Sequence, residues 1–261
     1  MPFANVNGIE LYYEEHGEGP ALIFAHGAGG NHLSWWQQVV AFAKQFRCVT
    51  FDHRGFGFSR ETPHGPGPKA FADDLRGLLD HLKIDRAALV SQSMGGWTSL
   101  GFAVAAPERV SALALCDTMA GVDDPEVVEE MKLHGAPKGG LAQVLTRVYA
   151  EDYPQREPAK AFLYRQISSL NLHVPPDLVP AMMNLRHRVD ALLEKRVPTM
   201  ILVGEQDALT TPRLMEVIAR RIPHARFIKV PGAGHSVYFE KPEQFNRALA
   251  DFLRDAGAAN R

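Results

Sequence analysis

Cysteine is scarce in this sequence, which has only Cys48 and Cys116 among its 261 residues. Both lie in apolar, strand-like runs, so we expect two buried free thiols and neither a disulfide nor a metal site. The glycines in 27-GAGG-30 do not complete the nucleotide-binding pattern G-x-G-x-x-G, because His32 stands at its last position. We therefore expect no cofactor and no metal.

An excess of charge of either sign is also missing, since 28 Lys and Arg stand against 30 Asp and Glu for a net charge of −2. A nucleic-acid surface normally needs a basic excess on one face, so we expect no nucleic-acid partner. No apolar run approaches the roughly 20 residues that cross a bilayer. The N-terminal segment lacks the basic start and apolar centre of a signal peptide. We expect no membrane partner, a cytoplasmic location, and a monomer or homodimer.

What the sequence does contain is a series of short, nearly continuous apolar runs that end in Gly, Ser or Asp. They are 21-ALIFAHG-27, 46-FRCVTFD-52, 87-AALVSQS-93, 110-VSALALCD-117, 198-PTMILVGEQD-207 and 226-RFIKVPG-232. Such runs are typical of strands buried on both faces of a parallel sheet. Segments with helical spacing alternate with them, at 70–83, 95–106, 212–222 and 242–256. The alternation predicts a doubly wound, mostly parallel α/β sheet, in which chemistry gathers at the carboxyl ends of the strands.

The two ends of this pattern differ from its middle. Asn7-Gly8 between two strand-like runs predicts a tight hairpin, and the mixed face of the second run, residues 9–15, is typical of an antiparallel edge. Between about residues 119 and 196 the sequence is helical and irregular, with repeated prolines and no buried-strand run. We predict a core of residues 1–118 and 197–261 with a helical cap, 119–196, inserted over one end of the sheet. An ordinary helical excursion is the alternative.

The stretch 90-VSQSMGGW-97 lacks the first glycine of the pattern G-x-S-x-G, because Ser91 stands in its place. Ser93 falls where a predicted buried strand turns into a helix, which is the setting of a nucleophile elbow. Such a turn needs small residues on both sides, and Gly95 and Gly96 supply them after the serine. Ser91 lies within the strand, where its hydroxyl cannot reach a substrate. Ser93 is therefore the predicted nucleophile.

Five motifs together give the sequence a resemblance that extends over nearly its whole length. They are 26-HGAGG-30, 52-DHRGFGFS-59, 91-SQSMGG-96, 204-GEQDALT-210 and 232-GAGHSVYFEKPEQF-245. With them, the sequence resembles the α/β-hydrolase superfamily. The resemblance implies the α/β-hydrolase fold and a catalytic triad in the chain order serine, acid, histidine.

The resemblance implies catalytic roles for Ser93, Asp207 and His235. His235 lies in a glycine-bracketed loop before the last helix, where an imidazole can turn toward the serine and accept its proton. Asp207 follows the strand that normally carries the acid and would hold the imidazole. Asp117, at the end of an earlier strand, is the alternative acid; it can otherwise cap a helix or line a pocket.

The loop after the first parallel strand is implied to form half of an oxyanion hole. The backbone N–H groups of Ala28 and Met94 would stabilise the developing negative charge. We expect His26 to brace that loop by hydrogen bonds. Asp52 and Arg54, in the next glycine-rich loop, are expected to form a structural ion pair without a catalytic role.

A serine at the elbow disfavours members of the superfamily that use an aspartate there, such as haloalkane dehalogenases and epoxide hydrolases. Gln92 and Ser236 flank the implied nucleophile and base where many carbon–carbon bond hydrolases carry other residues, which favours a small carboxylic ester or lactone as substrate. Two alternatives stay open. One is a carbon–carbon bond hydrolase that acts on a vinylogous 1,5-diketone, and the other is a binding member of the fold without catalysis.

The substrate pocket is expected to be apolar and to receive a small acyl or aryl group. The residues predicted to bind substrate are Trp35, Trp97, Met182 and Tyr149. Three arginines of the insertion can bind a substrate carboxylate, which would favour carbon–carbon bond cleavage; these are Arg165, Arg186 and Arg188. Solvated helix charges are the alternative reading for them.

Overall fold

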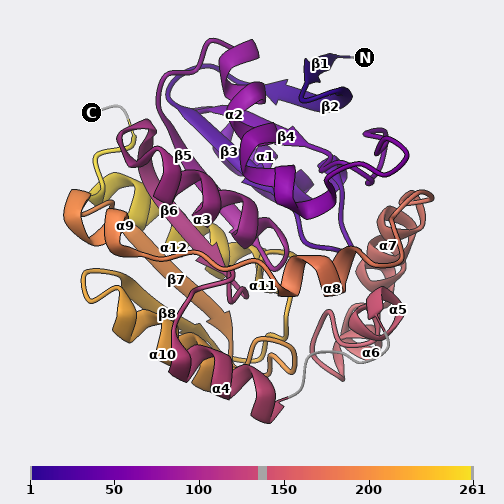
Figure 1. Cartoon of the computed structure of the whole chain (residues 1–261). Coiled ribbons are helices and arrows are strands. Elements are labelled where there is room, and N and C mark those ends of the chain that lie inside the picture. Colours follow the sequence, from indigo (N-terminus) through magenta and orange to yellow (C-terminus); the bar gives the residue numbers. More distant parts are fainter. Residues whose placement is uncertain (1, 135–139, 260–261) are drawn as a thin grey trace.

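The computed structural model of the chain describes residues 2–134 and 140–259, and these contain an eight-stranded sheet (Figure 1). The strands are β1 Phe3–Val6, β2 Ile9–His16, β3 Ala21–Ala25, β4 Arg47–Phe51, β5 Ala87–Gln92, β6 Val110–Cys116, β7 Thr199–Gly204 and β8 Arg226–Val230. Their order in the sheet is β1-β2-β4-β3-β5-β6-β7-β8. The pairs between β4 and β8 are all parallel. The predicted mostly parallel sheet is confirmed, with a strand in each of the six apolar runs.

The hairpin predicted at Asn7-Gly8 joins β1 to β2 in an antiparallel pair. Both residues have positive φ, +44° for Asn7 and +82° for Gly8, as a two-residue type I′ turn requires. β2 also pairs with β4, so it lies second from the edge and β1 is the outermost strand. The expectation that residues 9–15 form the edge is corrected accordingly.

Residues of the parallel strands alternate between the two faces of the sheet. In β3, Leu22 and Phe24 belong to one apolar cluster, while Ile23 and Ala25 belong to the other. Helices α2 (Phe71–His81), α3 (Gly95–Ala105) and α10 (Pro212–Arg221) pack on the Ile23 face. Helices α1 (Trp36–Phe42) and α12 (Pro242–Asp255) pack on the Leu22 face. Burial on both faces explains why these strands are continuously apolar.

In its described part, the segment between β6 and β7 consists of helices joined by turns and loops, and it pairs through a single β-bridge. It contains α4 Pro125–His134, α5 Gly140–Leu145, α6 Tyr153–Arg156, α7 Pro158–Ser169, α8 Leu178–Met183 and α9 Asp190–Lys195. Figure 1 shows α5, α6 and α7 grouped to one side of the sheet. The bridge pairs Val122 with His187, and the His187 N–H donates to the carbonyl of Gly121 at 2.7 Å. The two ends of the segment are thereby held together.

Short elements carry the chain around the sheet ends. They are η1 His32–Trp35, η2 Gly67–Ala70, η3 Pro107–Arg109 and α11 Val237–Glu240. Cys48 and Cys116 are buried free thiols, as predicted. Within the described ranges, no helix has both the length and the apolar character that crossing a bilayer requires. The same ranges contain no group of three or more His, Cys, Asp or Glu side chains suited to a metal ion.

Candidate active site

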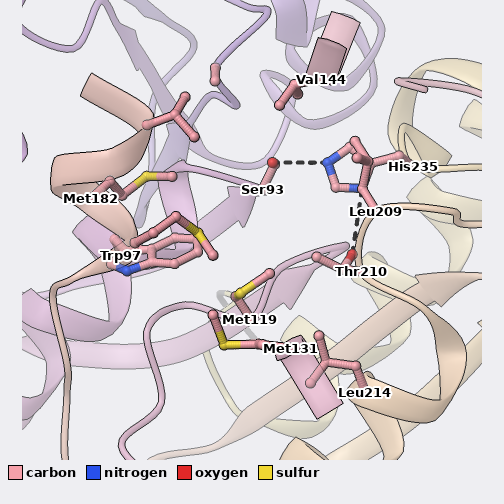
Figure 2. Close-up of a pocket in the computed structure, with 13 residues that line it drawn as sticks. Ser93, Trp97, Met119, Met131, Val144, Met182, Leu209, Thr210, Leu214 and His235 are labelled. Carbon is pink, nitrogen blue, oxygen red and sulfur yellow. Dashed lines mark hydrogen bonds between the residues drawn. The ribbon is translucent and has the colours of Figure 1, made fainter. Parts of the chain in front are cut away.

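Ser93 occupies the sharp turn between β5 and α3. Its φ is +50°, in the left-handed region that residues other than glycine rarely adopt. The turn is held by its own backbone, since the Ser93 N–H donates to the carbonyl of Cys116 at 3.1 Å and the Gly96 N–H donates to the carbonyl of Ser93 at 2.9 Å. This backbone lifts the hydroxyl clear of the sheet and toward His235 (Figure 2).

The small residues around the turn are required by close approaches of the backbone. A Cβ atom on Gly95 would lie 2.2 Å from the carbonyl oxygen of Ala25, and one on Gly96 would lie 2.2 Å from the Thr118 hydroxyl. Ser91 is fully buried inside β5, and its hydroxyl donates to the carbonyl of Ala114 at 3.0 Å. The hydroxyl of the serine that replaces the first glycine therefore has its hydrogen-bond partner within the sheet. A serine at this position is compatible with the turn.

His235 lies between Ser93 and Asp207. Its Nε2 is 2.9 Å from the Ser93 hydroxyl, and its Nδ1 is 2.9 Å from Oδ2 and 3.1 Å from Oδ1 of Asp207. With Nδ1–H donating to the carboxylate, Nε2 keeps a lone pair that can accept the serine proton. The imidazole is almost completely buried, at 2% exposure, so little water competes for either nitrogen. The arrangement can deprotonate the serine hydroxyl.

The Asp207 carboxylate is held by the turn that follows β7. Its Oδ1 accepts hydrogen bonds from the N–H groups of Leu209 and Thr210, at 2.8 and 2.9 Å. The Thr210 hydroxyl donates to Oδ2 at 2.6 Å and lies 3.4 Å from the imidazole Nδ1. Thr210 was not among the predicted site residues, although it ends the motif 204-GEQDALT-210. Its position three residues after the acid was the available signal, since such residues commonly bond back within a turn.

Asp117 ends β6 close to this site but serves another purpose. It is fully buried, and its oxygens accept hydrogen bonds from the N–H groups of Gly204 at 2.9 Å and Val237 at 3.3 Å. Burial, reinforced by the charge of Asp207, raises the pKa of Asp117 well above its ordinary value. Asp117 therefore ties the end of β7 to the start of α11. It does not lie among the residues that line the pocket described below.

The two N–H groups predicted for the oxyanion hole lie on either side of the nucleophile. Ala28 belongs to the loop after β3 and lines the pocket, while Met94 directly follows Ser93. Among the described residues, neither backbone N–H has a hydrogen-bond acceptor. A buried N–H without an acceptor is uncommon, and two of them beside a serine hydroxyl can hold a substrate oxygen.

His26 braces the loop that carries Ala28, as predicted. Its Nδ1–H donates to the carbonyl of Gly27 at 2.8 Å, and its Nε2 accepts the N–H of His53 at 3.0 Å. Burial lowers the pKa of His26 to about 4. The ring is consequently neutral at physiological pH and can accept at Nε2.

The lowered pKa of His26 predicts a loss of stability in mild acid. As pH falls from about 6.5 to about 4, His26 takes up a proton in the unfolded chain but stays neutral in the folded chain. Relative to a His26→Gln variant, the wild-type protein should lose up to about 1.4 kcal/mol of unfolding free energy per pH unit in this range. Urea unfolding of both proteins across the range measures the difference. A difference that does not change with pH would contradict a neutral buried His26.

The expected ion pair between Asp52 and Arg54 does not form. Asp52 accepts the N–H of His32 at 2.6 Å and the N–H of Phe58 at 2.8 Å. Arg54 makes a bidentate pair with Asp74, with both N–O distances at 2.6 Å. Each of the two residues is therefore bound to a different element. Both are structural, as expected, but through other partners.

A hollow that is partly open to solvent lies next to the Ser93 hydroxyl. Figure 2 shows the side chains that surround it. The lining residues are Ala28, Ser93, Trp97, Met119, Met131, Val144, Val179, Met182, Met183, Leu209, Thr210, Leu214 and His235. The wall is apolar except near the serine and the histidine, and no Lys or Arg stands among these residues. Four methionines give it adaptable walls, because their side chains are flexible.

Two of the four residues predicted to bind substrate, Trp97 and Met182, line this hollow. Trp35 does not, because its fully buried ring packs under the sheet against Tyr238, with ring centres 4.5 Å apart. Tyr149 does not either, since it lines neighbouring surface hollows with Leu145. For Trp35 and Tyr149 the prediction is therefore corrected by the structure.

The three arginines considered for carboxylate binding also lie outside the lining. Arg165 faces a surface hollow beside Tyr149. Arg186 donates to the carbonyls of Met183 and Leu185, while Arg188 pairs with Asp190 in an exposed position. These contacts agree with the solvated, structural interpretation of the arginines.

Comparison with known proteins places this geometry in a family. The model of the alpha/beta hydrolase fold family matches residues 20–242 of the chain. The chain belongs to the alpha/beta hydrolase family. Several of its relatives are named as hydrolases, and the chain is a hydrolase as well.

Individual relatives of this alpha/beta hydrolase cover nearly its whole length. A protein of Azorhizobium caulinodans named "Putative carbamate hydrolase RutD" is 28% identical over an alignment of 269 positions. The alignment covers 97% of this chain and 98% of that protein. The structure is similar to that of a thermophilic esterase from Thermogutta terrifontis, with a TM-score of 0.82, 30% identity and 98% coverage of each chain. It is also similar to an enol-lactonase from Burkholderia xenovorans, with a TM-score of 0.78, 30% identity, and coverage of 97% of this chain and 100% of that one.

Proposed function

We propose that this alpha/beta hydrolase is a serine hydrolase that cleaves a small, neutral carboxylic ester or lactone through an acyl-enzyme. The observation that carries the proposal is the continuous chain of hydrogen bonds from Ser93 through His235 to Asp207, with 2.9 Å at each end of the imidazole. Similarity to an esterase and an enol-lactonase supports the same class of bond.

The proposed reaction begins when His235 Nε2 takes the proton of the Ser93 hydroxyl as its oxygen attacks the carbonyl carbon. The carbonyl π electrons move to oxygen, and the resulting oxyanion accepts hydrogen bonds from the N–H groups of Ala28 and Met94. The intermediate then expels the alkoxide, which takes the proton from His235, and the acyl group stays on Ser93. Water gives a proton to His235 as its oxygen attacks the acyl carbon. The second tetrahedral intermediate then breaks its bond to the Ser93 oxygen, which takes the proton back from His235, and the carboxylic acid leaves. Asp207 keeps Nδ1–H in place and stabilises the imidazolium.

A fluorophosphonate probe tests the proposal against a binding protein that keeps the fold without catalysis. The expected result is one covalent adduct on the folded protein, located at Ser93 by peptide mass. The phosphorus centre reacts only with a hydroxyl that a neighbouring base has activated. A folded wild-type protein that carries no adduct and turns over no ester would favour the binding function.

The apolar lining predicts selection against charged acyl groups. We expect the kcat/KM for mono-p-nitrophenyl glutarate to be lower by about 10²-fold or more than that for p-nitrophenyl pentanoate. The two acyl chains have the same length, but burying the terminal carboxylate without a cation costs several kcal/mol. Initial rates with both esters measure the ratio. Similar values for the two esters would show that a cation reaches the acyl group, and would favour carbon–carbon bond cleavage.

The helical segment 119–196 is proposed to act as a cap over this site. Its residues Met131, Val144, Val179 and Met182 line the same hollow as Ser93 of the core. A substrate in the hollow would thus touch both parts. The cap would determine the size and shape of the acyl group, while the loops of the core carry out the chemistry.

A further inference from the structure

Glu240, at the end of α11, is a buried acid that the proposed reaction does not use. It is 5% exposed, and the charge of Arg156 acts on it only weakly compared with burial and with the N–H groups that it accepts. Its Oε1 instead accepts the N–H of Gly234 at 2.9 Å and the N–H of Ser236 at 3.3 Å. These are the residues immediately before and after His235. Burial raises the pKa of Glu240, while the N–H donors favour its charged form.

The second oxygen of Glu240 reaches a different part of the chain. Oε2 accepts the N–H of Ala150 at 3.0 Å, from the turn between α5 and α6. The same turn lies against the histidine loop, since a Cβ atom on Gly234 would be only 2.2 Å from the Ala150 nitrogen. One carboxylate therefore joins the loop of the proposed base to the helical segment that covers the pocket.

The peptide carbonyl of His235 has a hydrogen-bond partner of its own. The Gln92 side-chain amide donates to it at 2.7 Å, and Gln92 directly precedes the nucleophile. Gln92 thus binds the carbonyl of His235, while Glu240 binds the N–H groups of the residues before and after it. A glycine-bracketed loop would otherwise be free to move, because glycine restricts the backbone least.

We propose that Glu240 is a positioning residue that holds the His235 loop in register with Ser93 and ties it to the cap at Ala150. The inference rests on the proposed function, because it assumes that His235 is the base. Reaction geometry is sensitive at this point, since a misplacement of about 1 Å can cost about 10²-fold in rate. The carboxylate acts through the loop and touches neither substrate nor the reacting atoms.

Two substitutions at this position separate positioning from simple stabilisation. Glu240→Ala removes every acceptor, and kcat for p-nitrophenyl pentanoate should fall by about tenfold or more while KM changes by about twofold at most. Glu240→Gln keeps one carbonyl oxygen, which suffices for the N–H groups of Gly234 and Ser236. We expect it to restore kcat to within about threefold of wild type. Should Glu240→Ala not fold, Glu240→Asp, which withdraws the carboxylate by one methylene, should show the same fall in kcat.

Gln38→Ala is the matched control. Gln38 is fully buried on α1, and its amide donates to the carbonyl of Tyr238 on α11 at 2.9 Å without touching the histidine loop. It should lower the unfolding midpoint while kcat stays within about twofold of wild type. Equal losses of kcat in Gln38→Ala and Glu240→Ala, or a folded Glu240→Ala with wild-type kcat, would overturn the inference. Absence of turnover and of fluorophosphonate labelling in the wild-type protein would overturn the proposed function, and the inference with it.

Discussion

Ser93→Ala is expected to lower kcat for p-nitrophenyl esters by about 10⁴-fold or more and to abolish fluorophosphonate labelling. The hydroxyl is the only group at the elbow that can form the acyl-enzyme, and it lies 2.9 Å from the Nε2 of His235. Alanine removes one oxygen and leaves the backbone to be held by the contacts with Cys116 and Gly96. The loss should therefore occur in a protein of nearly wild-type stability, as measured by urea unfolding.

Ser91 provides the matched control for this experiment, because it is a serine two residues earlier, inside β5. Its hydroxyl bonds to the carbonyl of Ala114 inside the sheet. Ser91→Ala and Ser91→Gly should cost about 1 kcal/mol of unfolding free energy, the usual net value of one such hydrogen bond. Activity should stay within about threefold of wild type. Equal loss of turnover from changes at either serine would mean that the nucleophile has been assigned to the wrong residue.

The sheet was predictable because strands that are buried on both faces have continuously apolar sequences. Each of the six apolar runs became a strand, and the Asn7-Gly8 turn became the hairpin. The position of β2, second from the edge of the sheet, was not predictable in the same way. A mixed face indicates partial solvent exposure, but it does not distinguish an outer strand from one covered by a four-residue neighbour such as β1.

The position of Ser93, His235 and Asp207 was predictable for a related reason. Each follows a strand at the same end of a parallel sheet, and each motif contains the small or polar residues that its turn requires. The pocket wall was less predictable, because it depends on how separate elements pack. Trp35 ends η1 directly before α1, and its ring packs in the apolar cluster on the Leu22 face of the sheet. Nothing in the local sequence distinguishes that ring from one that faces substrate.

Ion pairs were the least predictable feature. Asp52 and Arg54 are two residues apart and opposite in charge, yet Arg54 found its partner in Asp74 on α2. Proximity in sequence says little about contacts in a tight loop, where successive side chains leave in different directions. The same limit applies to the acid of the proposed triad. Asp207 and Asp117 both follow parallel strands that lie next to each other in the sheet, and sequence position alone does not separate their roles.

Asp207→Asn is expected to lower kcat by about 10⁴-fold, as the same substitution of the acid does in known Ser-His-Asp enzymes. The N–H groups of Leu209 and Thr210 both donate to Oδ1, so an amide at this position would turn its carbonyl oxygen toward them. Its NH₂ group would then face the imidazole Nδ1 and donate to it. The imidazole would carry its proton on Nε2 and could no longer accept one from Ser93.

Asp117→Asn is the comparison that decides between the two acids. Among the described residues, its carboxyl accepts hydrogen bonds only from the N–H groups of Gly204 and Val237. An amide there would weaken the connection between β7 and α11 and leave the tautomer of His235 intact. We expect kcat to fall by less than about tenfold, with a loss of about 1–3 kcal/mol in unfolding free energy from the opposed N–H groups. Steady-state rates and urea unfolding of both variants measure the contrast. A larger loss of kcat in Asp117→Asn than in Asp207→Asn would move the catalytic acid to the end of β6.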